Sequence, residues 1–275
     1  MTLHEKYKGW ALITGASSGI GEEFAKRLAS KKLDLILVAR RKNRLNKLAK
    51  EFKANHGIQV VVAAIDLSKQ NFMDELKKKV GKREVSVLIN NAGFGYNGNY
   101  VDGNTNRFEE MVNVNCLAPA LLTHYFAKQM IERKNGAIIF LGSLVGYQPT
   151  PMTTLYSATK AFNLFLGESL WYELREHNVD VLALNPGGTA TEFQKVAGTS
   201  AGPIPRSVQQ VVDTAMKYLG KKPSVVDGNI NRVMSFIPRL ISRKLTVNLA
   251  GKMRKKLYTA PSVFPEGGVQ LLKKH

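Results

Sequence analysis

The stretch that decides the fold is WALITGASSGIGEEF, residues 10–24. Its first part, up to Thr14, is a short apolar run of the kind that forms a strand buried on both faces. A helix begins near the end of the stretch, and Gly15, Gly19 and Gly21 lie at the turn that leads into it. Glycines there let backbone N–H groups approach a pyrophosphate at the positive end of a helix. The spacing is G-x-x-x-G-x-G and not G-x-G-x-x-G, so a plain tight turn stays the alternative.

Apolar bursts and amphipathic helical segments alternate from this stretch to about residue 187. The bursts lack the alternation of a half-exposed strand, which is typical of strands covered on both faces. Alternating strands and helices predict an α/β fold, a Rossmann-type doubly wound parallel sheet with helices on both faces. We expect strands at 9–15, 33–40, 59–67, 85–93, 136–143 and 179–187, and helices at 19–32, 42–57, 71–81, 106–133 and 155–177.

Length and charge predict one domain and an extension. The chain has 275 residues, of which 44% are hydrophobic, and it shows no internal repeat, so we expect residues 1–228 to form a single domain. The net charge is +19, and residues 221–275 hold twelve Lys and Arg against Asp227 and Glu266, a net of +10. We expect residues 229–275 to form a basic, amphipathic helical extension that packs on the domain or extends from it.

The composition argues against several classes of protein. The single cysteine, Cys116, permits no disulfide within the chain, and the N-terminus lacks the shape of a signal peptide. No run of 18 apolar residues could span a membrane. The five histidines lack metal-ligand spacing, and the extension lacks the interleaved aromatics of a nucleic-acid-binding surface. We therefore expect a cytoplasmic protein with no metal and no nucleic-acid partner.

The end of the second expected strand is basic. Enzymes that use NAD tend to place an acidic residue about 20 positions beyond the glycines, where it holds the ribose 2′-OH. Here Ala39, Arg40 and Arg41 occupy that neighbourhood, and the Arg40 guanidinium can fork onto a 2′-phosphate. The pattern favours NADP(H) over NAD(H). The alternative is the solvated basic start of a helix.

Polar residues follow the third and fourth expected strands. Asp66 follows the third, where its side chain can reach an adenine edge, and Asn90 and Asn91 follow the fourth. The carboxyl ends of the strands line the ligand crevice of an open α/β sheet. The sequence NNAG could instead form only a turn.

The stretch LYSATKAF places Tyr156 and Lys160 four residues apart, on one face of a helix. The phenol has a free pKa near 10, and a positive charge nearby lowers that pKa. The spacing is therefore typical of a tuned proton donor. An ordinary helix with one aromatic and one snorkelling lysine is the alternative.

Six motifs in order make the chain resemble the short-chain dehydrogenase/reductase family of NAD(P)-dependent oxidoreductases. They are TGASSGIG, NNAG, VNVN, GSLVG, YSATK and NPGGTAT, and they cover about residues 10–192. The resemblance implies one domain with a seven-stranded parallel sheet. It also implies an enzyme that interconverts a carbonyl and an alcohol.

The resemblance implies four catalytic residues. Tyr156 exchanges the substrate proton, and Lys160 lowers the tyrosine pKa and binds the nicotinamide ribose. Ser143 polarises the substrate carbonyl, and Asn115 completes a water-linked proton relay. Ser143 could instead merely end a strand, and Asn115, which the V-N-x-hydrophobic context favours over Asn113, could merely cap a break in a helix.

The same resemblance implies a set of cofactor-binding residues. They are Gly15, Ser17, Ser18, Gly19, Ile20, Gly21, Arg40, Arg41, Asp66, Leu67, Asn90, Ala92, Gly93, Tyr156, Lys160, Pro186, Gly187, Thr189 and Thr191. The following segment, residues 192–207, is rich in small residues and falls where the family carries a mobile substrate lid. A mobile surface loop is the alternative reading of that segment.

The substrate is expected to be an apolar small molecule, because apolar side chains cluster near the expected cleft: Phe94, Tyr96, Leu144, Met152 and Phe193. These residues could also be plain wall packing. Cys116 is expected to be a packed thiol. A second class of function stays open, in which the chain is a non-catalytic NADP-binding sensor or scaffold; a turnover assay separates the two.

Two surfaces predict partners. The outer faces of helices 106–133 and 155–177 favour a homo-oligomer through Leu121, Leu122, Phe126, Phe165, Leu170 and Trp171, unless these residues cover the sheet. Residues 231–257 mix apolar and basic residues with no acid. That is the composition of an interfacial helix on an anionic membrane. The alternative is a helix that packs on the substrate pocket or on a partner subunit.

Overall fold

Short runs of β-branched and other apolar residues form a sheet of seven strands. The computed structural model describes residues 3–198 and 205–259. All the strands run parallel, in the order β3-β2-β1-β4-β5-β6-β7. They are β1 (Trp10–Thr14), β2 (Asp34–Ala39), β3 (Val60–Ala64), β4 (Val85–Asn90), β5 (Gly136–Leu141), β6 (Val179–Asn185) and β7 (Ser224–Val226). The expected doubly wound sheet is therefore confirmed.

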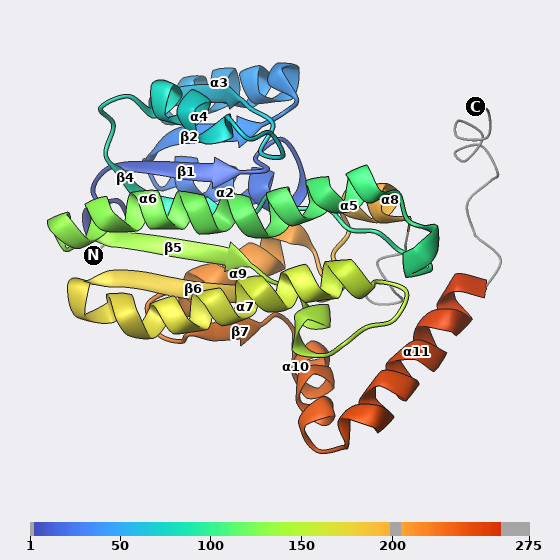
Figure 1. Cartoon of the computed structure of the whole chain (residues 1–275). Helices are drawn as coiled ribbons and strands as arrows, with labels where there is room; N and C mark the ends of the chain where they lie inside the picture. The colour runs from blue at the N-terminus through green and yellow to red at the C-terminus, as the bar shows by residue number, and fades with distance from the viewer. Residues whose placement is uncertain (1–2, 199–204, 260–275) are drawn as a thin grey trace, which may run out of the picture.

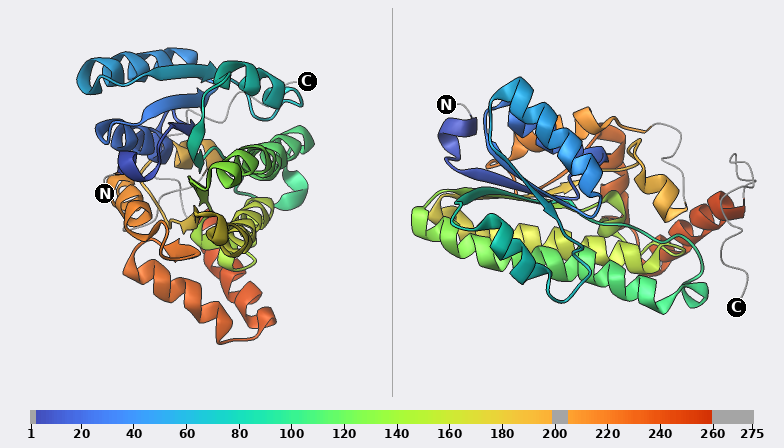
Figure 2. Two further views of the ribbon diagram at one scale, coloured as in Figure 1. Left: turned by 90° about the vertical axis from the view of Figure 1, so that its left-hand side faces the viewer. Right: turned by 90° about the horizontal axis from the view of Figure 1, so that it is seen from above.

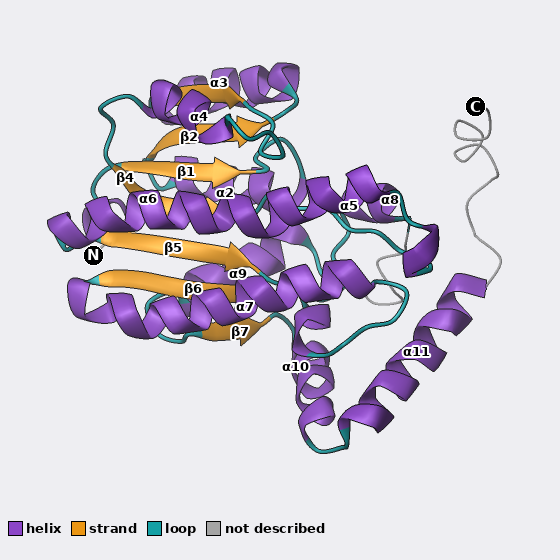
Figure 3. Cartoon of the chain, in the orientation of Figure 1, coloured by secondary structure: helices purple, strands orange, loops and turns teal. Residues whose placement is uncertain are grey.

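Helices cover both faces of the sheet (Figure 3). The apolar sides of α2 (Gly19–Ser30), α3 (Lys42–His56) and α9 (Val208–Tyr218) pack on one face. Those of α4 (Phe72–Val80), α6 (Ala118–Arg133) and α7 (Thr154–Leu174) pack on the other. Because both faces are covered, every residue of β4 and β5 is buried. The short helices α1 (Leu3–Lys6), η1 (Tyr100–Asp102), η3 (Leu144–Tyr147), η4 (Arg175–His177) and α8 (Phe193–Ala197) join these elements.

The expected helix over 106–133 is interrupted. It divides into α5 (Thr105–Val112), a π-helical turn η2 (Asn113–Leu117) and α6. Single π-turns within helices frequently mark functional sites, because they release backbone groups from the regular ladder. This turn contains Asn115, which is fully buried.

The expected outer faces are only partly correct. Leu122 and Phe126 are each 1% exposed and cover the sheet, so placing them on an outer face was wrong. Leu170 and Trp171 also pack against the core. Leu121 and Phe165 are exposed.

The C-terminal extension folds as α10 (Asn229–Phe236), a turn η5 (Ile237–Arg239) and α11 (Arg243–Thr259). Figures 1 and 2 place these helices beyond the carboxyl ends of the strands, where α11 runs obliquely away from the sheet. Among the described residues, no helix combines the length and apolar character needed to cross a bilayer. The rest of the extension, residues 260–275, lies outside the described residues.

Candidate active site

The glycine-rich turn is closed by Asn91, which follows β4. The Asn91 Nδ2 donates to the carbonyl of Thr14, at 2.8 Å. A Cβ at Gly15 would lie 2.6 Å from that nitrogen, and a Cβ at Gly21 would lie 2.3 Å from it. Gly15 and Gly19 also have positive φ angles of 68° and 59°. Only glycine fits this turn, because side chains would clash or strain the backbone.

Thr14 joins the ends of β1 and β4. Its Oγ1 donates to the carbonyl of Ile89 at 3.1 Å and accepts from the backbone N–H groups of Asn91 and Ala92 at 2.9 and 3.0 Å. The strand order reverses between β1 and β4, which is where an open α/β sheet binds its ligand. A small hollow in this region is lined by residues that include Leu67, Asn90, Ala92 and Val114.

Asp66 and Asn90 have local partners. The Asp66 carboxylate accepts from the backbone and the hydroxyl of Ser68, at 3.0 and 2.9 Å. Partial burial works to raise the pKa of Asp66, but the bonds from Ser68 and the charges of Arg40 and Lys69 hold it below its usual value. The Asn90 amide donates to Thr123 of α6, at 2.9 Å.

A basic corner lies beside the glycine-rich turn. Arg41 donates to the hydroxyls of Ser17 and Ser18, at 3.0 and 2.7 Å from Nη2. Arg41 and Arg44 also each donate to the carboxylate of Glu192, at 2.7 Å. The two bonds from the arginines hold the pKa of Glu192 below its usual value. Arg41 therefore contacts the turn, whereas the exposed Arg40 acts on Asp66 through its charge.

The π-turn fixes Asn115 below the β4–α5 loop. Its Oδ1 accepts from the backbone N–H of Phe94 at 3.1 Å, and its Nδ2 donates to the carbonyl of Phe94 at 2.9 Å and to Thr159 Oγ1 at 3.0 Å. The Asn115 carbonyl accepts from Asn163 Nδ2 at 2.8 Å. A Cβ at Gly93 would lie 3.1 Å from Asn115 Oδ1 and 3.5 Å from Lys160 Nζ, so Gly93 leaves these groups their space.

Ser143, Tyr156 and Lys160 converge beyond the end of β5. Ser143 caps η3, and its side chain hydrogen-bonds to the Tyr156 hydroxyl. Lys160 is 5% exposed and donates from Nζ to the carbonyl of Leu141 at 2.6 Å. The same nitrogen lies 5.7 Å from the centre of the Tyr156 ring. The structure therefore brings together all four residues of the expected catalytic set.

The protonation of this cluster differs from the expectation. Burial lowers the pKa of Lys160 to about 8. Burial raises the pKa of Tyr156, while the bond from Ser143 and the charge of Arg254 work to lower it. The expected lowering by Lys160 is not found, because its ammonium is directed to the Leu141 carbonyl. Burial also raises the pKa of the Cys116 thiol to about 11, in keeping with a packed thiol.

The segment after β6 is organised by Gln194. Its Oε1 accepts from the N–H and the hydroxyl of Thr191, each at 3.1 Å, and its Nε2 donates to the carbonyl of Thr189. A Cβ at Gly19 would lie 3.1 Å from the Thr191 side chain, so this segment lies against the glycine-rich turn. Upstream, the Pro186 carbonyl accepts from Leu144 N, at 2.9 Å.

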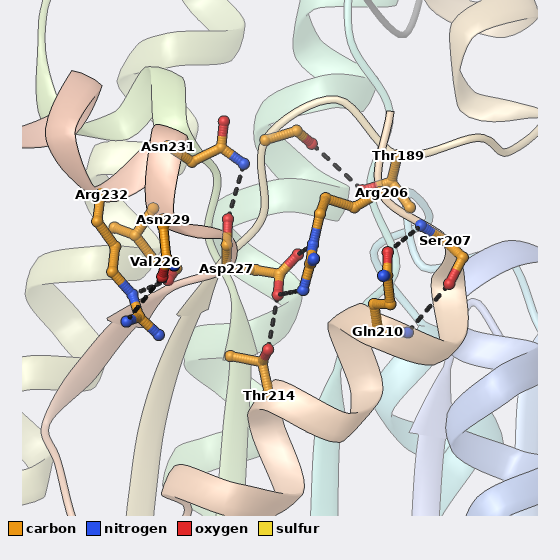
Figure 4. Close-up of polar contacts among 11 residues, drawn as sticks. Thr189, Arg206, Ser207, Gln210, Thr214, Val226, Asp227, Asn229, Asn231 and Arg232 are labelled. Atoms are coloured by element: carbon orange, nitrogen blue, oxygen red, sulfur yellow. Dashed lines mark hydrogen bonds and ion pairs between the residues drawn. The ribbon is translucent and has the colours of Figure 1, made fainter. Parts of the chain in front are cut away.

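Figure 4 shows how this segment is anchored at its base. Thr189 and Arg206 form an isolated parallel bridge, and the Arg206 side chain forms an ion pair with Asp227 after β7. Residues 199–204 of the expected lid lie outside the described residues.

Apolar side chains surround Tyr156 unevenly. The ring of Phe193 in α8 lies 5.3 Å from the ring of Tyr156, and a Cβ at Gly95 would meet both rings. Phe94 is buried beneath the guanidinium of Arg107, 3.8 Å away, and Tyr96 packs edge-on against Phe108. The remaining expected wall residues, Leu144 and Met152, are partly buried. Only Phe193 contacts the Tyr156 ring among the aromatic pairs of the described residues.

Several residues of the site carried no signal in the sequence. Gln194 acts by hydrogen bonds within its own loop, Asp227 by hydrogen bonds to Arg206 and Thr214, and Arg254 acts on Tyr156 from α11, 98 residues later. A glutamine three residues after the last motif and an aspartate after a three-residue strand are too common to single out.

Known proteins resemble this chain in sequence and in structure. The family model for short chain dehydrogenases matches residues 9–201. A very-long-chain 3-oxoacyl-CoA reductase from Podospora anserina is 35% identical over 83% of this chain and 67% of its own. A 7beta-hydroxysteroid dehydrogenase from Clostridium sardiniense is 31% identical over 92% of this chain and 98% of its own. A short-chain dehydrogenase from Sphingobium yanoikuyae, solved with NADPH, has a TM-score of 0.75 at 30% identity over 93% of this chain and 98% of its own.

Proposed function

The chain belongs to the short-chain dehydrogenase/reductase family, oxidoreductases that act on CH–OH and C=O groups, and on that premise we propose that it interconverts a bulky apolar carbonyl compound and its alcohol with NADP(H). The observation that carries the proposal is the convergence of Ser143, Tyr156 and Lys160 beside the crevice at the strand ends. A non-catalytic scaffold would have no need for a buried ammonium with a lowered pKa four residues from a partly buried phenol.

The residues at the strand ends fit a dinucleotide. Gly15 and Gly21 leave no room for a side chain, which keeps the backbone of the turn accessible to a pyrophosphate. Leu67, Ala92 and Asn90 lie together at or just beyond the ends of β3 and β4, at the edge of the sheet where an open α/β fold holds its ligand. Thr189 and Thr191 would hold the carboxamide of the nicotinamide, and Lys160 its ribose. When bound, the cofactor supplies or accepts the hydride.

The preference for NADP(H) rests on Arg41. Its guanidinium already joins Ser17 and Ser18 and binds a carboxylate, that of Glu192. A 2′-phosphate offers the same guanidinium a doubly charged acceptor. We assign the closer role to Arg41 and a supporting charge to Arg40, which is nearer Asp66.

Catalysis in the reductive direction would use the two hydroxyls first. Ser143 and Tyr156 donate hydrogen bonds to the substrate oxygen as negative charge develops on it. Tyr156 then transfers its proton to that oxygen as general acid. Because burial raises the pKa of the phenol, the protonated acid is the resting form across neutral pH.

The phenolate left behind must be stabilised and reprotonated. The Ser143 hydrogen bond and the positive charge of Arg254 both favour it. Lys160, with a pKa near 8, can carry a proton toward it or away near neutral pH. Asn115 and Asn163 would continue the proton path, since the π-turn exposes the Asn115 carbonyl to a side-chain donor. In the oxidative direction the same residues act in reverse, with Tyr156 as base.

The apolar substrate is supported by Phe193 over Tyr156 and by relatives named for long-chain acyl and steroid substrates. The deciding experiment is a screen of aliphatic, aromatic and steroidal ketones that follows NADPH absorbance, repeated in reverse with alcohols and NADP⁺. We expect turnover of at least one bulky ketone. If neither direction proceeds while NADPH binds, the chain is an NADP-binding sensor or scaffold.

Two further proposals concern assembly and location. The exposed Leu117, Leu121, Phe162, Phe165 and Tyr172 on the outer sides of η2, α6 and α7 support a homo-oligomer, which sedimentation would detect. The domain division at residue 228 follows the end of β7, and the extension beyond it supports peripheral contact of a cytoplasmic protein with an anionic membrane.

A further inference from the structure

Helix α11 turns its small and polar residues toward the domain. Thr246 and Ala250 are each 7% exposed, whereas the neighbouring Leu245 and Leu249 are each 45% exposed. Residues four apart lie above one another on a helix, so the buried face of α11 continues from Ala250 to Arg254. A helix that covered a core would show the reverse pattern.

The buried face of α11 reaches the start of α7. A Cβ at Gly251 would lie 3.4 Å from the ring of Pro151, so the two backbones pack closely there. Pro151 precedes Tyr156 by five residues. Arg254 lies three residues beyond Gly251, is partly buried, and its positive charge acts on Tyr156. The C-terminal extension therefore places the positive charge of Arg254 close enough to the active site to act on Tyr156.

This guanidinium has no counter-ion in the described part of the chain. None of the ion pairs there includes Arg254, and residues 228–259 contain no Asp or Glu. Burial lowers the pKa of Arg254, which reflects the cost of removing its charge from water. Buried charges in proteins are paired or hydrogen-bonded, because an unpaired one is expensive.

We propose that Arg254 is an anion-binding subsite of the active site, and that the substrate is an amphipathic carbonyl compound with an acidic group near the reacting carbon. The proposal rests on the proposed function, since it names the substrate class of the same site. Phe193 covers the apolar part of the substrate. The acidic group of the substrate serves as the counter-ion that Arg254 lacks.

The chain offers a matched control on the same helix. Lys252 is exposed and carries the same charge, so Lys252→Gln lowers the net charge of α11 equally without touching the buried face. Arg254→Gln removes the guanidinium, and Arg254→Lys keeps a charge without the fork. Circular dichroism and thermal unfolding establish that each variant is folded.

The probes are benzoylbutyrate, a ketone with a nearby carboxylate, and its methyl ester. Their dissociation constants are measured calorimetrically in the presence of NADP⁺, so that binding is read without turnover. We expect the full-length protein and Lys252→Gln to bind the acid at least about tenfold more tightly than the ester, since charge-assisted hydrogen bonds are strong. Arg254→Gln should lose that preference and leave ester binding unchanged, with Arg254→Lys intermediate.

Equal binding of acid and ester by the unaltered protein, or no binding of either, overturns the subsite. So does a preference that survives Arg254→Gln or disappears with Lys252→Gln. Turnover separates this proposal from the proposed function: selective binding of the acid without any NADPH oxidation in the ketone screen refutes the enzyme and retains the subsite. Where the acid is turned over, KM should rise in Arg254→Gln for the acid alone, while any loss of kcat through Tyr156 affects acid and ester equally.

Discussion

Arg206 forks onto Asp227: its Nε and Nη2 each lie 2.9 Å from a different carboxylate oxygen, and the Asp227 side chain is fully buried. Thr214 of α9 donates to the same carboxylate at 2.6 Å, and the backbone carbonyl of Asp227 accepts from Asn231 of α10 at 2.7 Å (Figure 4). A Cβ at Gly187 would clash with Asn231. Asp227 therefore ties the segment after β6, the helix before β7 and the start of the C-terminal extension into one unit.

The first prediction tests this tie. Arg206→Ala should lower the free energy of unfolding by about 3 kcal/mol, because it leaves a buried carboxylate without its charge partner. Arg206 is one-third exposed, so water relieves part of the cost and the lower end of the usual range applies. Urea unfolding at pH 7 measures the change. Arg206→Lys keeps the charge, so its free energy of unfolding should fall less. A fall below about 1 kcal/mol for the alanine variant would show that the ion pair is dispensable.

The second prediction concerns the proton donor. Tyr156→Phe should lower kcat by about 10²–10⁴-fold, the usual contribution of general acid catalysis, and leave the dissociation constant of NADPH nearly unchanged. The ring keeps its contact with Phe193, and Lys160 keeps its bond to Leu141. Steady-state rates and a fluorescence titration separate the two effects. Activity within tenfold of the unaltered enzyme contradicts the role.

The third prediction separates the two cofactors. Arg41→Ala should weaken NADPH binding by about 10- to 100-fold and NADH binding little, because only NADPH carries the 2′-phosphate. Glu192→Gln should have the opposite sign and tighten NADPH binding, since Glu192 occupies the guanidinium groups of Arg41 and Arg44. Fluorescence titrations with both cofactors measure the four constants. Equal dissociation constants of NADPH and NADH for the unaltered protein would contradict the proposed preference for NADPH.

Periodicity and motif spacing predicted most of the fold because its strands are continuous apolar runs. Helix α3 ends at Gly57, in the left-handed conformation that a closing glycine predicts. β7 has only three residues, and its pattern carries no signal of its own. The π-turn at Asn113–Leu117 was not predicted either, because a break at Asn115 was only an alternative and the sequence did not show its type.

The candidate site, like the fold, was predicted only in part. Gly15, Asn115, Ser143, Tyr156 and Lys160 were predicted together because short motifs fix them to strand ends and one helix face. The direction of the Tyr156 pKa shift was not predicted, because it depends on burial and on the charge of Arg254 in α11. Long-range contacts of this kind leave no spacing in the sequence.

The fourth prediction concerns pH. Burial lowers the pKa of Lys160 to about 8 from its ordinary 10.5, so the unfolded chain binds more protons between these values and stability gained from this group rises with pH. The Lys160→Met variant has no titratable group at this position, so its stability lacks this pH-dependent contribution. The free energy of unfolding of the unaltered protein, minus that of the variant, should therefore rise by about 2 kcal/mol between pH 7 and 9.5. Urea melts at several pH values measure it; a difference that is flat or falls means that Lys160 is not depressed.

The last prediction concerns the exposed face of the extension. Large apolar side chains of α10, η5, α11 and the loop before α11 are 43% to 69% exposed: Ile230, Val233, Met234, Phe236, Ile237, Leu240, Leu245, Leu249 and Met253. Exposed apolar patches mark interaction sites. Arg239, Arg243, Lys244 and Lys252 are exposed in the same helices, and residues 228–259 contain no acid. A second copy of the same face would meet like charge, so an anionic bilayer is the better complement.

The full-length protein should pellet with anionic vesicles at low salt and remain in solution with neutral ones. Each basic group near an anionic surface contributes about 1 kcal/mol, and that attraction is screened, so about 0.5 M salt should release most of the protein. The variant with Phe236→Ser, Leu240→Ser and Leu249→Ser keeps every charge and the buried face of α11 but loses apolar anchors, and we expect it to bind more weakly at every salt concentration. If the unaltered protein ignores anionic vesicles, or the triple variant binds them equally well, this face serves a protein partner, and sedimentation that shows a dimer lost in the variant would identify that partner as a second copy.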